Sequence, residues 1–242
     1  MGGALAGTFG SPLMVEDSAI YGSSANLYGA IYNFAGEMTL VNTTVYGNSG
    51  QYGAVQNSSG IGAPATLDVR SSTIAGNSGG PAIETYAFDG AAAATATLQN
   101  SIVSGPGQHC SIVGDNGATA ELASLGHNIA GDDSCNLIDP TDFPNTNPRL
   151  GPLADNGGAT MTGALLKGSP ALDNGNDLAC PGHDQRGLTR VDRDGNGDPG
   201  DTNPCDIGAF ELQPAVLNLP PVANDQTVNV IANTPRAIPL PG

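Results

Sequence analysis

The chain has 242 residues, and 39% of them are hydrophobic, which is enough to bury the core of one large or two smaller domains. With 35 Gly, 18 Pro and only 12% charged residues, the composition disfavours long helices and favours an all-β fold with frequent turns. The formal net charge of -16 would repel nucleic acid, and no apolar run is long enough for a transmembrane helix. We therefore expect neither a nucleic-acid partner nor a membrane span.

Residues 1–130 contain a repeat of aliphatic positions, with offsets of 25, 29 and 29 residues between successive units. One column holds Val15, Leu40, Val69 and Leu98, and a second holds Ile20, Val45, Ile74 and Val103. A glycine closes each unit, at Gly22, Gly47, Gly76 and Gly105. A further series comprises Ala30-Ile31, Ala54-Val55 and Ala82-Ile83. Each unit therefore contains at least two short strands separated by turns.

Such units bury their inward faces only by stacking, which joins the aliphatic columns into one core. The segment 40–49 and its echo at 73–78 resemble the right-handed parallel β-helix repeats of the pectin-lyase-like superfamily. The resemblance implies that residues 1–130 form coils of a right-handed parallel β-helix, which we expect to be truncated at its N-terminus.

Many pectin-lyase-like proteins cleave acidic polysaccharides, either with a basic residue beside Ca²⁺ or with clustered carboxylates. The candidates here are Arg70, Asp68 and Glu84, which fall in no shared column of the repeat. A lyase or glycosidase is therefore the alternative interpretation rather than the leading one.

Two tyrosines, Tyr21 and Tyr46, do share a repeat column. Neighbouring rings on one face would offer a platform to sugar rings or to a protein partner. Simple packing between coils is the competing explanation.

Four cysteines allow three disulfide connectivities. The sequence favours Cys110 with Cys135 and Cys180 with Cys205, because each pair encloses a similar span. Disulfides indicate an oxidising, exported setting. The first residues lack the features of a signal peptide, so we expect the export signal and any anchor to lie outside this sequence.

We expect residues 131–211 to contain the final coils and an acidic closing block, whose motifs occur in a characteristic order, from Asn147-Pro-Arg-Leu-Gly-Pro through Lys167-Gly-Ser-Pro-Ala-Leu-Asp to Cys205-Asp-Ile-Gly-Ala-Phe-Glu. Together they resemble the C-terminal region of bacterial choice-of-anchor Q domain proteins. The resemblance implies an exported surface protein whose β-helix is closed by this block, and it implies no enzymatic activity. Charge-assisted hydrogen bonds would fix this irregular segment, with a ligand site as the alternative, and the residues concerned are Asp184, Arg186, Arg190 and Glu211.

The block also contains the first half of a calcium-binding loop, with Asp192, Asp194 and Asn196 at its first, third and fifth positions. Position twelve is Asn203 rather than Glu, so Asp198 or Asp201 would have to complete a weak Ca²⁺ site. A solvated acidic turn is the alternative. We expect no other cofactor.

Residues 212–242 predict a Pro-rich linker and one alternating strand, and they resemble the start of an incomplete Ig-like or cadherin-like repeat. We expect the protein to be a non-catalytic, exported cell-surface or adhesin-like module whose partner is a glycan or another surface protein. The alternative is a polysaccharide lyase or glycoside hydrolase.

Overall fold

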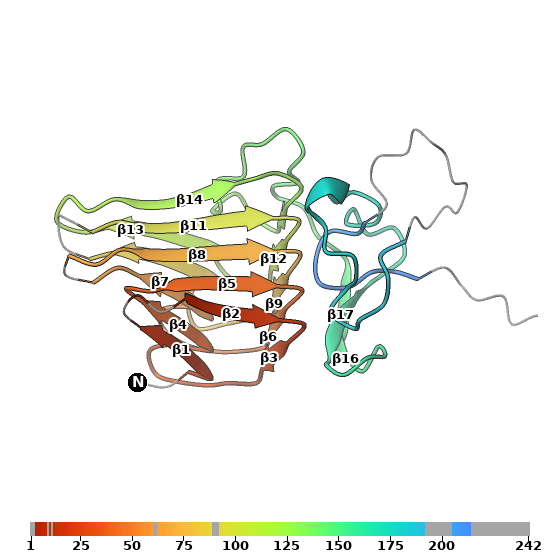
Figure 1. Cartoon of the computed structure of the whole chain (residues 1–242), viewed down its shortest axis with the longest axis horizontal. Helices are drawn as coiled ribbons and strands as arrows, with labels where there is room; N and C mark the ends of the chain where they lie inside the picture. The colour runs from red at the N-terminus through yellow and green to blue at the C-terminus, as the bar shows by residue number, and fades with distance from the viewer. Residues whose placement is uncertain are drawn as a thin grey trace, which may run out of the picture.

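The computed structural model describes residues 3–8, 10, 12–60, 62–88, 92–191 and 205–213. The chain winds into a parallel β-solenoid, and an irregular C-terminal block packs against one side of it (Figure 1). The predicted all-β architecture is thereby confirmed. No helix among these residues is long and apolar enough to cross a membrane.

Each coil contributes one strand to each of three five-stranded sheets, and all neighbouring strands within these sheets are parallel. Sheet A comprises β1 (Leu5–Thr8), β4 (Ile31–Phe34), β7 (Val55–Ser58), β10 (Ile83–Ala87) and β13 (Cys110–Gly114). Sheet B comprises β2 (Pro12–Glu16), β5 (Glu37–Val41), β8 (Ala65–Arg70), β11 (Ala94–Gln99) and β14 (Ala120–Ser124). Sheet C comprises β3 (Ala19–Tyr21), β6 (Thr44–Tyr46), β9 (Thr73–Ala75), β12 (Ile102–Ser104) and β15 (Ile129–Ala130).

The aliphatic columns of the sequence are the inward rows of these sheets. Leu40 pairs with Val15 and Val69 in sheet B, and Val45 pairs with Ile20 and Ile74 in sheet C. The Ala-Ile series supplies the matching row of sheet A. All three rows meet in one buried core. The 25- to 29-residue period therefore reports the length of one coil.

Polar side chains also stack inside the solenoid, where they satisfy backbone groups at the turns. The backbone N–H of Asn48 donates to Oδ1 of Asn77 over 2.9 Å, and Nδ2 of Asn77 donates to the carbonyl of Val45 over 3.0 Å. Both asparagines are buried. Each coil thus fixes its neighbour's turn as well as its strands.

The C-terminal block contains one antiparallel hairpin, β16 (Leu150–Ala154) with β17 (Thr162–Leu165), and a short 3-10 helix, η1 (Asp177–Ala179). It lies beside sheet C (Figure 1), where a second apolar cluster joins Ile102 and Ile129 of the solenoid to Leu165, Ile207 and Phe210 of the block. The block is therefore docked on the solenoid through a core of its own.

Both favoured disulfides are present, Cys110–Cys135 and Cys180–Cys205, each with a sequence separation of 25 residues. Cys110 continues the buried row of sheet A after Ile83, and its Cα lies 4.8 Å from that of Cys135. That distance equals the usual spacing of about 4.8 Å between neighbouring strands. The first disulfide therefore closes the end of an aliphatic row.

Candidate ligand-binding groove

The outward face of sheet A carries the largest group of aromatic side chains in the described part of the chain. Because successive side chains of a strand point to opposite faces, the residues one and three positions after each inward aliphatic face solvent. Tyr32, Gln56 and Glu84 form one such outward row across β4, β7 and β10. Phe34, Ser58 and Tyr86 form the next.

Tyr28 and Tyr52, from the turns before β4 and β7, extend the aromatic surface at one end. The rings of Tyr28 and Tyr32 are stacked, with centroids 4.0 Å apart and an angle of 3° between the planes. Tyr52 lies against Tyr28 with a centroid distance of 5.9 Å. These three rings form one wall of a groove.

The opposite wall consists of Tyr86 and Phe88, whose ring centroids lie 5.2 Å apart in an edge-to-face arrangement. Between the walls is a groove of about 360 Å³, which Phe34, Ser58, Gln56 and Glu84 also line. Aromatic walls with a few polar groups on the floor are typical of small-molecule and glycan sites.

The polar floor of the groove is unevenly satisfied. Nε2 of Gln56 donates a hydrogen bond of 2.8 Å to Oε2 of Glu84. Gln56 is only 6% exposed, and its buried Oε1 has no hydrogen-bond partner among the described residues. Burial raises the pKa of Glu84 above its ordinary value, and the bond from Gln56 opposes that rise. The floor therefore presents acceptors without enough donors.

Of the three residues considered for catalysis, Glu84 lies in this groove and the other two do not. Asp68 and Arg70 are on β8 of sheet B, where they form an ion pair with each other. Oγ1 of Thr97 also donates to Asp68 over 2.8 Å. The structure thus does not bring Glu84 together with Asp68 and Arg70.

Tyr21 and Tyr46 lie opposite each other on β3 and β6 of sheet C, away from the groove. Tyr21 is 51% exposed. Tyr46 borders a separate hollow of about 290 Å³ between sheet C and residues 147–152. The repeat column correctly predicted that Tyr21 and Tyr46 are neighbours, but the larger aromatic face is on sheet A. The Ala-Ile series in the sequence could have located this face, because the residues that alternate with its inward positions form the outward rows of sheet A.

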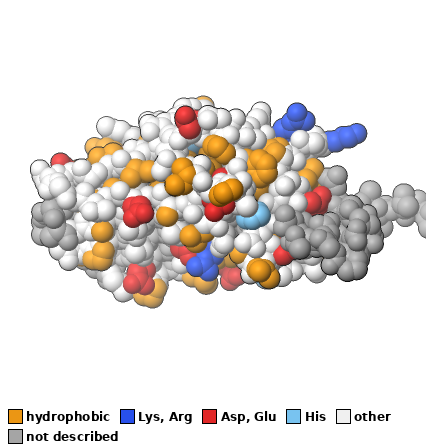
Figure 2. All heavy atoms as spheres, turned by 90° about the horizontal axis from the view of Figure 1, so that it is seen from above, with side chains coloured by type: hydrophobic (Ala, Val, Ile, Leu, Met, Phe, Trp, Pro, Cys, Tyr) orange, Lys and Arg blue, Asp and Glu red, His pale blue; other side chains and the backbone are white. Residues whose placement is uncertain are grey.

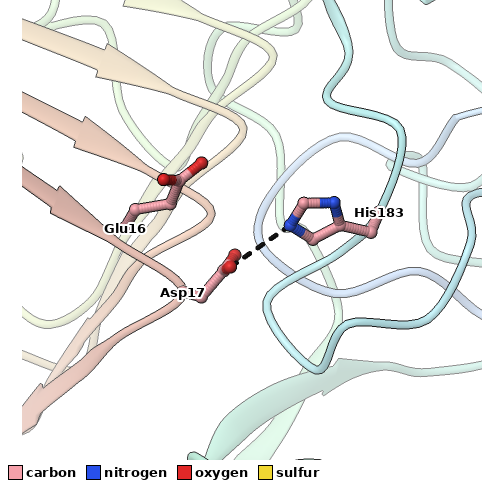
Figure 3. Close-up of side chains that lie close together, drawn as sticks. All are labelled: Glu16, Asp17 and His183. Atoms are coloured by element: carbon pink, nitrogen blue, oxygen red, sulfur yellow. Dashed lines mark hydrogen bonds and ion pairs between the residues drawn. The ribbon is translucent and has the colours of Figure 1, made fainter.

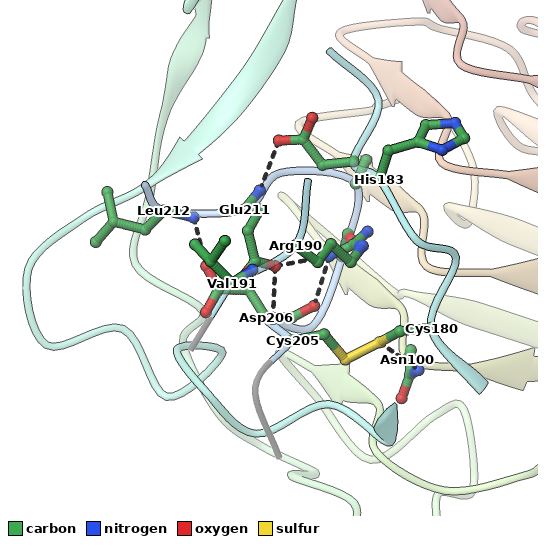
Figure 4. Close-up of polar contacts among 12 residues, drawn as sticks. Asn100, Cys180, His183, Arg190, Val191, Cys205, Asp206, Glu211 and Leu212 are labelled. Carbon is green, nitrogen blue, oxygen red and sulfur yellow. Dashed lines mark hydrogen bonds and ion pairs between the residues drawn. A yellow bond between two sulfur atoms is a disulfide. The ribbon is translucent and has the colours of Figure 1, made fainter. Parts of the chain in front are cut away.

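The four charged residues predicted to fix the block do lie together. Arg186 pairs with Asp184 over 2.8 Å. Arg190 pairs with Glu211 over 3.0 Å (Figure 4). Both carboxylates are fully buried, and the backbone N–H of Asp206 donates to Glu211 over 2.9 Å. Each of these four side chains has a partner within the protein, as in a structural network, although Nε of Arg190 has none among the described residues.

A second cluster of charged groups joins the block to the first turn of the solenoid (Figure 3). Nε2 of His183 lies 3.2 Å from Oδ2 of Asp17, and Glu16 has a carboxylate oxygen within 4.8 Å of both. Nδ2 of Asn42 also donates to Asp17 over 3.2 Å. This contact could not be predicted from the sequence, because Asp17 and His183 are 166 residues apart. The contact fastens the two parts of the fold.

The predicted calcium loop, with Asp192, Asp194, Asn196, Asp198 and Asp201, lies outside the described residues. The same holds for the tail from residue 214 onward.

Figure 2 views the end of the solenoid formed by the last coil. Hydrophobic side chains gather along the middle of this face and acidic ones are scattered around them (Figure 2). Ile138 is 80% exposed and Leu125 is 48% exposed.

No protein-family model matches this chain, and no curated protein or solved structure matches it either.

Proposed function

We propose that this protein is a non-catalytic, exported binding module that holds a carbohydrate chain in the aromatic groove of sheet A. The observation that carries the proposal is the pairing of two aromatic walls with a polar floor in a groove of about 360 Å³. The apolar faces of sugar rings pack on aromatic rings, while their hydroxyl groups require hydrogen-bonding partners such as Gln56 and Glu84.

An extracellular site of action is supported by the two disulfides, which persist in oxidising compartments. The resemblance of residues 147–211 to choice-of-anchor Q proteins supports display at a bacterial cell surface. The resemblance of residues 1–130 to pectin-lyase-like repeats supports a carbohydrate as the ligand. An adhesin-like role fits a solenoid that presents its outward face to a polymer.

Hydrolysis of a polysaccharide is a second candidate function, favoured by a raised carboxyl pKa inside a groove. Most glycoside hydrolases place two carboxyl groups on either side of the scissile bond. Among the described residues that line this groove, Glu84 is the only carboxylate, and none is Lys, Arg or His. Binding without cleavage is therefore the function that the geometry favours.

A glycan array followed by calorimetry with the best oligosaccharide tests the proposal. We expect Tyr28→Ala to weaken binding at least about tenfold, because its ring forms one wall of the groove. The matched control is Tyr21→Ala, an exposed tyrosine on sheet C, which should leave the affinity unchanged.

A wild-type protein that binds no glycan would overturn the proposal, as would a loss confined to Tyr21→Ala. Release of reducing ends from the bound oligosaccharide, abolished by Glu84→Gln, would establish the hydrolase instead.

A further inference from the structure

We propose that the groove selects a glycan bearing protonated amino groups, so that an amino sugar binds in preference to neutral or acidic sugars. This inference rests on the proposed function, since it names the class of carbohydrate that the same groove would hold. It is carried by the hydrogen-bonding deficit of the groove floor, by its charge, and by the rings around it.

The groove floor contains hydrogen-bond acceptors that lack donors. One N–H of the Gln56 amide donates to Glu84, and the buried Oε1 of Gln56 has no donor among the described residues. Of the two oxygens of Glu84, Oε2 accepts the bond from Gln56, and no hydrogen bond to Oε1 is formed within the described part of the chain. Glu84, which lines the groove, therefore keeps an oxygen to which a ligand can donate, and an ammonium group brings three donors.

The charge of the groove is also one-sided. Glu84 is half-buried between the aromatic walls, and no basic side chain is among the described residues that line the groove. A carboxylate in such a place lacks a positive partner, whereas a hydrogen bond from an ammonium group is charge-assisted and stronger than one from a hydroxyl. A uronic acid would instead bring its own carboxylate toward Glu84, so the same floor disfavours acidic sugars.

The aromatic rings around the groove also favour a cation. Six aromatic residues line the groove: Tyr28, Tyr32, Phe34, Tyr52, Tyr86 and Phe88. The face of an aromatic ring attracts a cation within about 6 Å, and that attraction strengthens when water is excluded. The same walls therefore favour a charged amine over its neutral acetylated form, in addition to stacking with the sugar ring.

Calorimetry with two matched oligosaccharides tests the inference on the wild-type protein. One is a glucosamine oligomer and the other is the N-acetylglucosamine oligomer of equal length, which differs only in the acetyl groups that remove the charge. At a pH where the amine is protonated, we expect the glucosamine oligomer to bind at least tenfold more tightly. A galacturonic acid oligomer of the same length should bind more weakly than either.

The variant Glu84→Gln separates the roles of charge and shape. We expect it to reduce the preference for the glucosamine oligomer to less than about twofold while binding of the N-acetylated oligomer persists. Glu121→Gln removes one negative charge from the exposed face of β14 and should leave the preference intact. The wild-type ratio stands on its own if Glu84→Gln fails to fold.

Equal or tighter binding of the N-acetylated oligomer would overturn the inference and leave carbohydrate binding in place. Absence of binding to every oligosaccharide would overturn the proposed function and the inference together. A preference that Glu84→Gln leaves unchanged would also overturn the inference, because the charge would then lie elsewhere.

Discussion

Glu211 is a fully buried carboxylate at the centre of the C-terminal block. Two other buried carboxylates, Asp184 and Asp206, lie in the same network, in which the described residues supply two guanidinium groups, those of Arg186 and Arg190. Burial, followed by the charge of Asp206, raises the pKa of Glu211 to about 8, and burial raises that of Asp206 to about 6. The pair therefore retains a proton in the folded block.

This retained proton makes stability depend on pH in a defined direction. Glu211 has an ordinary pKa of 4.5, so between 4.5 and about 8 the folded state binds more protons than the unfolded chain. We therefore expect the melting temperature to fall as the pH rises through this window. Glu211→Gln keeps an oxygen that can accept from Arg190 and Asp206 but cannot titrate, so its melting temperature should vary less with pH.

Thermal melts of both proteins between about pH 5 and about pH 9 make the comparison, with Glu121→Gln as the control for net charge. Parallel curves for the wild-type protein and Glu211→Gln would show that the proton resides on another group.

At the level of single residues, the sequence named Glu84 as a catalytic candidate beside Asp68 and Arg70, with no repeat column shared among them. Asp68 and Arg70 are closer to Glu84 in sequence than Tyr32 is, yet they belong to another sheet. Which residues share a face depends on where each coil turns, and the aliphatic period alone does not specify this. The unpaired oxygen of Gln56 had no sequence signal, since it follows from a side-chain contact between coils.

Successive coils pack closely at glycine-rich turns beside the groove. A Cβ built on Gly50 would lie 2.3 Å from the backbone nitrogen of Gly29 and 2.9 Å from the carbonyl carbon of Tyr28. Both contacts are with backbone, which cannot move aside as a flexible side chain would. The stacking of these turns therefore requires glycine at this position.

We accordingly predict that Gly50→Ala destabilises the protein by about 3 kcal/mol, at the upper end of the usual cost of overpacking. Because Tyr28 lies in the first wall of the groove, the same change should also weaken glycan binding. Gly182→Ala is the control, since nothing lies within 4 Å of a Cβ at that position. Denaturant unfolding measures the difference, and equal stabilities of the two variants would contradict the close packing.

The elements themselves were predictable to different degrees. The aliphatic columns predicted the stacked coils because one inward column of sheet B and one of sheet C hold a large apolar residue in four successive coils. The last coil was less visible, since Cys110 and Ser124 replace aliphatics in its rows. The block has no period to detect, because buried ion pairs and a small apolar cluster hold its irregular chain in place.

The whole chain contains 23 acidic residues and 7 basic ones. This excess creates a negative potential that extends beyond any single contact and attracts cationic ligands from solution. A glycan bearing protonated amines would therefore be steered toward the protein before it reaches the groove, whereas its acetylated counterpart would not.

We predict that salt slows the association of the glucosamine oligomer and leaves that of the N-acetylglucosamine oligomer nearly unchanged. Raising the ionic strength from about 0.01 M to about 1 M shortens the Debye length from about 30 Å to about 3 Å. Stopped-flow or surface-based kinetics would report the two association rates. Rates that respond equally to salt would show that the overall charge has no part in recognition.

The disulfide between Cys110 and Cys135 has a further consequence for the resistance of the molecule to proteolysis. The turn after β13, around the exposed Asn116, is enclosed between the two cysteines. A protease that cuts the chain there would leave both pieces covalently joined, with the last coil still attached to the core. Damage at this exposed turn would thus be tolerated, and the groove on the preceding coils would keep its shape.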